Sequence, residues 1–362
     1  MRAIVLVGGM GTRLRPLTYS TPKQMLPVVD VPMIARVLEG LAEHGVDVAI
    51  LSLGYRPDAF LEAFPDSTAA GVELRYAVEP EPLDTAGAVR FAARAGGIDE
   101  TFIVVNGDVL TDLDVSAVVA LHRERGAEGT IALTPVPNPS AFGIVAMEPD
   151  GRVLAFVEKP PPGEEPTNLA NAGTYVLEPS VVDRIAADRP ASIERETFPA
   201  MAADRSLYAL ASDAYWLDTG TPAQYLAAQL DIVAGKRKSA RPPTSDEVEP
   251  GVHIDRDAQV EGTVEPYSYV GAGAFVHAGA RVASSVVSRR STVGSDAVVL
   301  RSVLLPGAVI GPGSRVEDSI VGPDSEVAEN CVMLAGTVIG AGEYVPALSV
   351  LEGARVPAGQ PA

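Results

Sequence analysis

Apolar side chains recur at a short, regular interval in the last third of the chain. From Val264 to Leu351 an aliphatic residue or methionine returns after six positions, or at three places after five. The region is rich in glycine, valine and other small residues and has few segments of helical character. A six-residue unit with one inward aliphatic side chain makes one short side of a triangular coil, so the repeat predicts stacked coils of short strands. The positions are Val264, Val270, Val276, Val282, Val287, Val293, Val298, Leu304, Ile310, Val316, Val321, Val327, Met333, Ile339, Val345 and Leu351.

This repeat resembles the hexapeptide-repeat family, whose fold is a left-handed parallel β-helix. We therefore expect a β-helix over residues 251–362; the alternative is a sandwich with chance spacing. Residues 236–250, rich in proline and charge without apolar periodicity, are expected to be a linker. His253 and His277 lie in the repeat, but no inserted acceptor loop accompanies them, so an acyltransferase is not expected. Assembly into a homo-oligomer is the expected role.

The first part of the chain has a different pattern. Short β-branched runs alternate with helix-period segments such as Met33–His44 and Val115–Arg125, which is the signal of repeated βαβ units. The runs are apolar throughout, which favours a mostly parallel sheet covered by helices on both faces. We expect an α/β, Rossmann-like domain over residues 1–235. The expected strands include Ile4–Val7, Val48–Leu53, Val72–Val78 and Phe102–Val105.

Charge and cysteine content exclude several classes of protein. The chain has 28 Lys and Arg against 47 Asp and Glu, a net charge of −19, which opposes a nucleic acid backbone. Cys331 is the single cysteine, so an internal disulfide is impossible. No apolar run reaches the ~20 residues of a membrane span. We expect a cytoplasmic protein without a membrane or nucleic acid partner, in which an anionic substrate meets local positive charge.

A glycine-rich loop follows the first expected strand. It runs Gly8-Gly9-Met10-Gly11-Thr12-Arg13, with Lys23 ten residues later. Glycines allow backbone N–H groups to approach phosphates, but the loop lacks the Gly-Lys-Ser/Thr of a P-loop, and Leu14 stands where the dinucleotide fingerprint has its third glycine. Only four of the basic residues are lysines, and two of these are Lys23 and Lys159. A compact ammonium group is therefore expected at both positions.

The loop and five later motifs together resemble the sugar-phosphate nucleotidyltransferases, also called NDP-sugar pyrophosphorylases. The resemblance covers residues 1 to about 235, and with the β-helix tail it is closest to the mannose-1-phosphate guanylyltransferase branch. The later motifs are Asn106-Gly107-Asp108, Phe142-Gly143-Ile144-Val145, Glu158-Lys159-Pro160, Asn171-Ala172-Gly173 and Trp216-Leu217-Asp218-Thr219-Gly220.

The resemblance implies that a sugar 1-phosphate attacks the α-phosphorus of an NTP, giving an NDP-sugar and pyrophosphate. Such a transfer depends mainly on positioning and on charge stabilisation. Mg²⁺ would be the cofactor, held by Asp108 and Asp218, and Arg13 and Lys23 would stabilise the phosphates. Further nucleotide contacts are expected from Leu6, Gly8, Gly9, Gly11, Thr12, Glu79, Thr85 and Gly107. The sugar phosphate would be held by Lys159, and the sugar hydroxyls by Gly143, Glu158 and Asn171.

The choice of base is expected to depend on Glu79, where thymidylyl relatives have glutamine. A carboxylate only accepts hydrogen bonds, which suits the adjacent N–H donors of guanine and opposes a pyrimidine carbonyl. The alternative is that Glu79 is a solvated loop residue. We expect GDP-mannose synthesis from GTP and mannose 1-phosphate; the alternatives are a thymidylyl-, uridylyl- or other guanylyltransferase, or a regulatory paralogue that has lost catalysis. Asp84 departs from the family, in which most relatives have glycine.

Overall fold

The computed structural model describes the chain except residues 55–56, 241, 243–244 and 358–362. The chain divides into two compact units. Unit 1 consists of Met1–Gly9 and Val37–Trp216, and unit 2 of Met10–Arg36 and Leu217–Ala362. This division differs from the predicted boundaries at 235 and 251, because residues 10–36 and 217–235 belong to the same unit as the C-terminal repeat.

Unit 1 is built on a ten-stranded mixed sheet in the order β11-β10-β12-β7-β1-β4-β6-β5, with β9 and β13 continuing from β12. Strands β7, β1, β4 and β6 run parallel, and β12 pairs antiparallel with β7. The expected α/β fold is confirmed. The strands are β1 (Arg2–Leu6), β4 (Val48–Leu53), β5 (Thr68–Ala69), β6 (Val72–Val78), β7 (Phe102–Asn106), β9 (Gly129–Pro135), β10 (Gly143–Met147), β11 (Val153–Glu158), β12 (Leu169–Leu177) and β13 (Leu207–Ala211).

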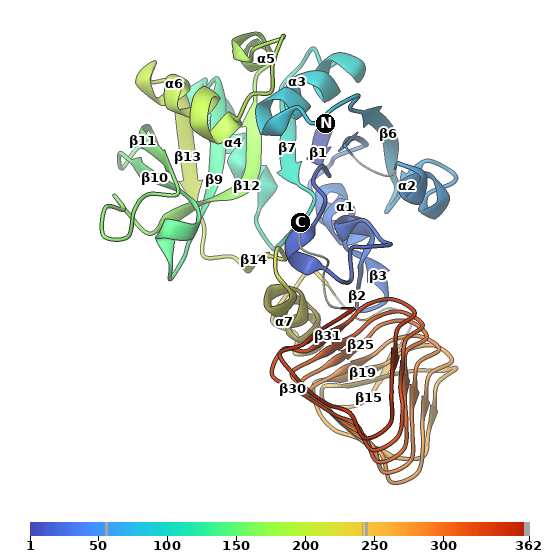
Figure 1. Ribbon diagram of the computed structural model, residues 1–362. Coiled ribbons are helices and arrows are strands. Elements are labelled where there is room, and N and C mark those ends of the chain that lie inside the picture. Colours follow the sequence, from blue (N-terminus) through green and yellow to red (C-terminus); the bar gives the residue numbers. More distant parts are fainter. Residues whose placement is uncertain (55–56, 241, 243–244, 358–362) are drawn as a thin grey trace. The chain divides into compact units, whose positions relative to one another are not determined.

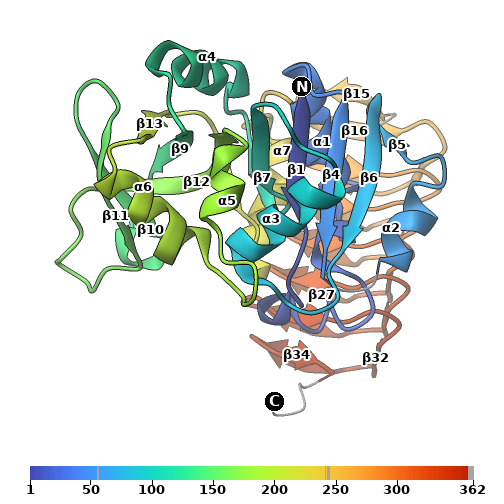
Figure 2. The same ribbon diagram turned by 90° about the horizontal axis from the view of Figure 1, so that it is seen from above.

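Helices cover both faces of this sheet (Figures 1 and 2). Ile4, Val104 and Tyr175 belong to one core with residues of α3, α5 and α6, whereas α4 packs on the opposite face against β9, β12 and β13. Strand β6 is not apolar throughout as expected: Glu73 and Arg75 are exposed, because only the short β5 lies beyond it. The helices are α2 (Asp58–Ala63), α3 (Asp84–Ala95), α4 (Val115–Arg125), α5 (Ser180–Arg184) and α6 (Phe198–Ala203), with a π-helix η4 at Ile193–Thr197. Helix α1 (Met33–Glu43) and the short strands β8 (Val109–Thr111) and β14 (Trp216–Asp218) lie outside the repeat as well.

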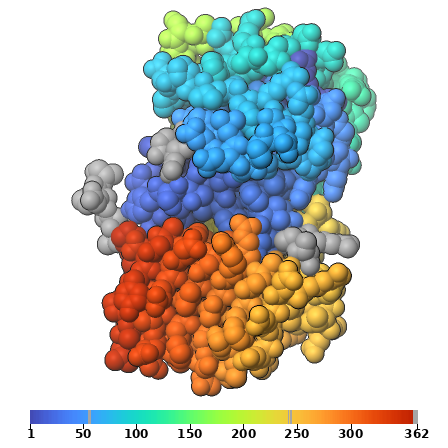
Figure 3. Space-filling model, turned by 90° about the vertical axis from the view of Figure 1, so that its right-hand side faces the viewer, coloured from blue at the N-terminus to red at the C-terminus, as the bar shows by residue number. Residues whose placement is uncertain are grey.

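The C-terminal repeat of unit 2 forms the predicted left-handed β-helix, whose three parallel sheets make the sides of a triangular coil (Figure 1). Successive coils follow one another along its axis from yellow to red (Figure 3). One turn takes 17 residues where Val286 pairs with Val303. The sheets are β16 (Val252–Asp255), β19 (Ser268–Val270), β22 (Val286–Val287), β25 (Val303–Leu304), β28 (Ile320–Val321), β31 (Val338–Ile339) and β34 (Arg355–Val356); β17 (Gln259–Val260), β20 (Phe275–Val276), β23 (Thr292–Val293), β26 (Val309–Ile310), β29 (Glu326–Val327) and β32 (Tyr344–Val345); and β18 (Thr263–Val264), β21 (Arg281–Ala283), β24 (Val298–Leu300), β27 (Arg315–Glu317), β30 (Val332–Leu334) and β33 (Val350–Glu352).

The inward positions agree with the predicted repeat except at one point. Val299, not Val298, is the fully buried residue of β24, and it pairs with Val282 and Val316 in the neighbouring coils. Val298 is half-buried on the outer side. Because 298 to 300 are all apolar, the sequence interval alone does not fix which side chain points inward.

The predicted linker ends in a strand. Residues 245–249 form β15 (Ser245–Glu249), which pairs antiparallel with β16 and covers the first edge of the β-helix. Its acidic side chains suit an edge strand, since charge discourages further pairing. The linker thus contributes structure to unit 2 rather than only a connection.

Residues 10–36 contact the β-helix through a hairpin of β2 (Pro27–Val28) and β3 (Val31–Pro32). At its tip Asp30 accepts hydrogen bonds from Tyr269 Oη at 3.1 Å and from the Arg289 backbone N–H at 2.9 Å. Burial raises the pKa of Asp30, although these hydrogen bonds oppose the change. Helix α7 (Pro222–Val233) also holds the hairpin, because Gln229 donates to Pro27 O at 2.7 Å. The segment that carries Arg13 and Lys23 is therefore anchored within unit 2.

Candidate active site

The ends of two adjacent parallel strands bring the glycine loop of unit 1 beside the Asn106-Gly107-Asp108 motif. Leu6 of β1 is in register with Asn106 of β7, so the residues that follow leave the same edge of the sheet. Gly107 N donates to Leu6 O at 2.9 Å. A Cβ on Gly107 would lie 2.6 Å from Val7 Cγ1, so glycine is required for this approach. Asp108 is half-buried directly after the strand.

The three glycines of the loop serve different purposes. Gly9 and Gly11 have φ angles of 104° and 58°, which favour glycine. A Cβ on Gly11 would also lie 3.1 Å from Thr18 Cγ2 and 3.2 Å from Lys23 Cβ. Gly8 lies outside the left-handed region, and apart from its two chain neighbours no residue of the described chain has an atom within 4 Å of where its Cβ would stand. Neither conformation nor packing within the described chain therefore accounts for glycine at position 8.

Unit 2 brings together three of the four predicted catalytic residues. Lys23 Nζ lies 3.8 Å from Asp218 Oδ1, and the Lys23 side chain is only 7% exposed. Arg13 reaches the same place: a Cβ on Gly220 would lie 2.6 Å from Arg13 Nη2 and 3.1 Å from Asp218 Oδ1. Arg13 and Asp218 therefore both lie close to Gly220, and Lys23 lies close to Asp218. Thr221 begins α7 as its N-cap and fixes the turn after Asp218.

The predicted sugar residues cluster in unit 1. Glu158 is half-buried, its Oε1 lies 3.6 Å from Lys159 Nζ, and a Cβ on Gly143 would lie 2.8 Å from its Oε2. Burial raises the pKa of Glu158, and the charge of Glu194 adds to this rise, whereas Lys159 opposes it. Lys159 itself is exposed and its backbone N–H donates to Phe142 O at 3.0 Å. An exposed ammonium group is available to bind an anion, although the neighbouring carboxylate partly offsets its charge.

Asn171 has hydrogen-bond partners within the protein. Its Nδ2 donates to Tyr175 Oη at 2.9 Å, and its Oδ1 accepts from the Gly173 N–H at 3.0 Å. An amide has one further N–H and one further lone pair, which leaves capacity for a substrate hydroxyl. Trp216 binds the same motif, since its Nε1 donates to Ala172 O at 2.9 Å. Its ring also packs edge-on against Phe142 at 5.6 Å, which joins three of the predicted motifs.

The segment from Glu79 to Gly87, which is predicted to contact nucleotide, has several hydrogen bonds within the protein. Glu79 accepts from Ser52 Oγ at 2.9 Å and from Leu83 N at 3.3 Å, so both carboxylate oxygens already have a donor. Thr85 Oγ1 donates to Glu194 at 2.6 Å. Asp84 has a φ of 59° and its Oδ1 accepts from Thr85 N at 2.7 Å. The left-handed conformation explains why glycine suits position 84, and aspartate tolerates it by bonding locally.

Glu194 is a residue that the sequence analysis missed. It lies in the π-helix η4, which follows no pattern recognisable in one sequence, and π-helical turns occur often at functional sites. Its bond to Thr85 Oγ1 joins segments more than 100 residues apart, and Ser192 Oγ of its own segment donates to it at 2.9 Å. The one local sign in the sequence is that Glu194 follows two residues after Ser192, the N-cap of this helix.

A divalent metal fits the chemistry of the predicted ligands. The described residues contain no group of three or more His, Cys, Asp or Glu side chains placed to hold a metal. Mg²⁺ is commonly bound by one or two carboxylates and completed by water and substrate phosphates. Asp108 and Asp218 supply donors of that type.

No helix in the described part of the chain is long and apolar enough to cross a membrane.

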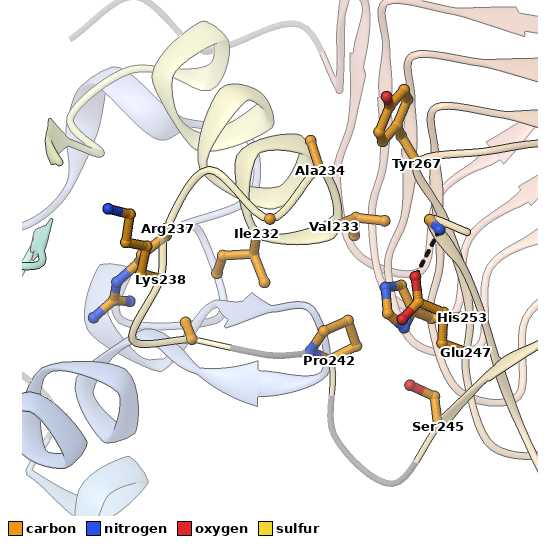
Figure 4. A pocket seen from close by; sticks show the side chains of 13 residues that line it. Ile232, Val233, Ala234, Arg237, Lys238, Pro242, Ser245, Glu247, His253 and Tyr267 are labelled. Atoms are coloured by element: carbon orange, nitrogen blue, oxygen red, sulfur yellow. Dashed lines mark hydrogen bonds between the residues drawn. The ribbon is translucent and has the colours of Figure 1, made fainter. Parts of the chain in front are cut away.

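A pocket of about 720 Å³ lies elsewhere in unit 2, between the end of α7 and the first coil (Figure 4). His253, Tyr267 and Glu247 line it, and Glu247 accepts from Gly251 N at 2.8 Å. None of the predicted site residues is among its described lining residues. It therefore carries none of the predicted chemistry.

Comparison with known proteins decides the family. Residues 2–235 match the Nucleotidyl transferase family, and residues 248–344 match the GMPPB C-terminal domain. The chain belongs to the nucleotidyltransferases. A "Mannose-1-phosphate guanylyltransferase" of Mycobacterium tuberculosis is 41% identical over 351 residues, which is 95% of each chain. "Mannose-1-phosphate guanylyltransferase 1" of Arabidopsis thaliana is 36% identical over 84% of this chain and 86% of its own.

Solved structures agree with the fold of this nucleotidyltransferase. HddC from Yersinia pseudotuberculosis, which has also been solved in complex with GMP-PN, matches with a TM-score of 0.54 and 28% identity, over 63% of this chain and 97% of its own. A putative glucose-1-phosphate thymidylyltransferase from Bacillus anthracis has a TM-score of 0.57 at 23% identity over 63% of this chain and 94% of its own, a likeness of fold. Enzymes of this family act on NTP and sugar phosphate substrates and generally use a divalent metal.

Proposed function

We propose that this nucleotidyltransferase makes GDP-mannose and pyrophosphate from GTP and mannose 1-phosphate with Mg²⁺. The observation that carries the reaction class is the cluster of Arg13, Lys23 and Asp218, in which two cations and a carboxylate meet at one turn. The choice of GTP and mannose is supported by the names of the relatives that align over most of the chain.

The proposed reaction forms one bond and breaks one. A phosphate oxygen of mannose 1-phosphate attacks the α-phosphorus of GTP, and the bond from this phosphorus to the oxygen that bridges to the β-phosphate breaks. That bridging oxygen leaves with pyrophosphate. Lys23 and Arg13 offset the negative charge on the α-phosphate and the leaving group, a role in which one lost donor typically costs ~10²- to 10³-fold in rate.

The sugar phosphate is assigned to Lys159 and the sugar hydroxyls to Glu158, Asn171 and the Gly143 backbone. Lys159 offers an exposed ammonium group for the phosphate. The raised pKa of Glu158 is consistent with a carboxyl that also meets a hydroxyl in a partly desolvated position. Mg²⁺, held by Asp108 and Asp218, would neutralise phosphate charge when bound.

Base recognition by Glu79 remains part of the proposal. Both of its oxygens accept hydrogen bonds in the structure, but each carboxylate oxygen has a second lone pair that could accept from guanine N1–H and N2–H. Glu79→Gln should lower kcat/KM for GTP by about 10- to 100-fold while dTTP or UTP loses less, since a lost polar match costs ~1 to 3 kcal/mol. Equal losses for all nucleotides would show that Glu79 only braces the turn at Leu83.

Association through the β-helix is a further part of the proposal. In its last described coil Tyr344, Leu348 and Val350 are 59%, 73% and 72% exposed, which is unusual for large apolar side chains. We expect a second copy of the chain to cover them. Light scattering on the full chain at micromolar concentration should give an oligomer mass, and a monomer mass contradicts this part.

The substrate assignment is tested by pyrophosphate release from each pairing of GTP, dTTP, UTP and ATP with mannose and glucose 1-phosphates. GTP with mannose 1-phosphate should give the highest kcat/KM. Asp218→Asn should lower kcat by at least about 100-fold while circular dichroism stays unchanged. A preference for dTTP or UTP overturns the guanylyl assignment, and normal turnover by folded Asp218→Asn overturns its metal role.

A further inference from the structure

Two segments of unit 1, far apart in the sequence, are joined at the start of helix α3. Ala191 O accepts from Ala86 N at 2.9 Å and from Gly87 N at 3.1 Å, while Ala191 N donates to Leu83 O at 3.0 Å. A Cβ on Gly87 would lie 2.9 Å from Leu83 Cβ, so the turn is tightly closed. The segment before the π-helix thus satisfies first-turn N–H groups of α3 that a helix itself cannot.

One side-chain pair completes this junction. Thr85 Oγ1 donates to Glu194 at 2.6 Å and accepts from the Ile193 N–H at 2.9 Å. Ser192 Oγ donates to the same Glu194 oxygen at 2.9 Å. The hydroxyl of Thr85 therefore has a donor and an acceptor within the protein. A bond to a charged acceptor is roughly twice as strong as a neutral one, so Glu194 holds the turn firmly.

The charge of Glu194 also acts on two neighbouring groups. It raises the pKa of Glu158, for which burial is the larger cause, and it has the same effect on the pKa of the buried Tyr175 phenol. Perturbed pKa values of this kind occur at many functional sites.

We propose that Glu194 is a positioning residue that fixes the nucleotide segment Leu83–Gly87 through Thr85. The π-helix η4 holds the Glu194 carboxylate at hydrogen-bonding distance from the Thr85 hydroxyl. The inference rests on the proposed function, because it takes Leu83–Gly87 as part of the nucleotide site. It changes the role of Thr85 from a nucleotide contact to a link between that segment and Glu194.

The test compares steady-state kinetics of full-length variants in pyrophosphate release. Thr85→Val should raise the KM for GTP by about tenfold, the effect of losing one hydrogen bond of ~1.4 kcal/mol, and leave the KM for mannose 1-phosphate within about twofold. Glu194→Ala should raise the KM for GTP equally. Glu194→Gln retains an acceptor for Thr85, so its KM for GTP should lie between those of wild type and Glu194→Ala.

A double variant distinguishes positioning from general damage. If Thr85 and Glu194 act through one bond, Thr85→Val with Glu194→Ala should raise the KM for GTP no more than either change alone. Glu196→Gln is the matched control, because Glu196 is exposed, pairs with Arg189 and lies two residues further on. It should leave both KM values unchanged.

The outcomes separate this inference from the proposed function. The positioning role is overturned if the double variant raises the KM for GTP by the product of the two single effects. It is also overturned if folded Thr85→Val leaves that KM unchanged. In both cases the wild type still catalyses the reaction. If the wild type prefers another NTP, the same comparison is made with that nucleotide. A wild type that releases no pyrophosphate from any NTP contradicts the proposed function instead; direct nucleotide binding to the variants by equilibrium dialysis then decides the positioning role.

Discussion

Gly8 offers a direct test of whether the first loop binds phosphate. Its φ lies outside the left-handed region, and apart from its two chain neighbours no residue of the described chain has an atom within 4 Å of where a Cβ would stand. Gly8→Ala is therefore free of strain in the protein alone. Because alanine restricts the unfolded chain, the substitution should raise the free energy of unfolding by ~0.4 to 1 kcal/mol.

The expected effect on nucleotide binding is opposite in sign. If backbone N–H groups of the loop approach the triphosphate, the added methyl group stands between them and loses one charge-assisted hydrogen bond. Such a bond is worth ~1.5 to 3 kcal/mol, which corresponds to a rise of about 10- to 150-fold in the dissociation constant for GTP. The variant should thus be more stable and bind GTP less tightly.

Gly40 provides the matched control. It lies within helix α1 and has an ordinary φ. Outside its own helix and its chain neighbours, no described residue has an atom within 4 Å of where its Cβ would stand. Gly40→Ala should stabilise the protein by ~0.5 to 1 kcal/mol through helix propensity and leave GTP binding unchanged. The assays are thermal unfolding and isothermal titration with GTP. Wild-type affinity in Gly8→Ala, or a loss of its stability, would refute the assignment of the loop.

Three further predictions concern separate parts of the chain. Asp108→Asn should lower kcat by at least about 100-fold with an unchanged circular dichroism spectrum, and near-normal turnover at saturating Mg²⁺ would remove Asp108 from the metal site. Val299→Asp should destabilise the β-helix by more than ~3 kcal/mol and Val298→Asp by less than ~1 kcal/mol, as measured by urea unfolding; equal losses would refute the inward position of Val299. Burial alone would raise the pKa of Glu128, but the hydrogen bonds that it accepts from Arg184 hold that pKa below the ordinary 4.5. Glu128→Gln should therefore lower the free energy of unfolding by ~1 to 2 kcal/mol above that pH and by progressively less as the pH falls below it. A loss that does not depend on pH would contradict the ion pair.

The regular elements were predictable because their side-chain periods are strong. Strands Val48–Leu53 and Val72–Val78 and helix Val115–Arg125 have the predicted bounds. Helix Val115–Arg125 has Asp114 as its N-cap and Gly126 in a left-handed conformation as its end, both of which are local signals. The bounds of an element could therefore be predicted where residues at its own ends determine where it begins and ends.

Prediction was incomplete where the deciding partner is distant in the sequence. The register of Val299 depends on Val282 and Val316 in adjacent coils. Residues 10–36 belong to the unit of the β-helix because Asp30 is bonded to Tyr269 and to the Arg289 backbone, more than 200 residues away. No local pattern in a single sequence reports such contacts.

The candidate site was predictable in its residue types but not in its internal bonding. Arg13 and Lys23 come together in the structure with Asp218, which lies far from them in the sequence, and the roles of all three stay predictions. Thr85 was expected to contact nucleotide, yet its hydroxyl is bonded to Glu194, which lies in none of the recognised motifs. Motifs indicate which residues meet a substrate, whereas the residues that support them emerge only from the fold.

The position of a phosphorus label reports directly whether the protein transfers a nucleotidyl group. The protein is incubated with Mg²⁺, mannose 1-phosphate and GTP that carries radioactive phosphorus at either the α or the γ position, and the products are separated by anion exchange. Nucleotidyl transfer places the α label in GDP-mannose and the γ label in pyrophosphate. A γ label in a sugar phosphate or in inorganic phosphate, with the α label remaining in GDP or GMP, would contradict it.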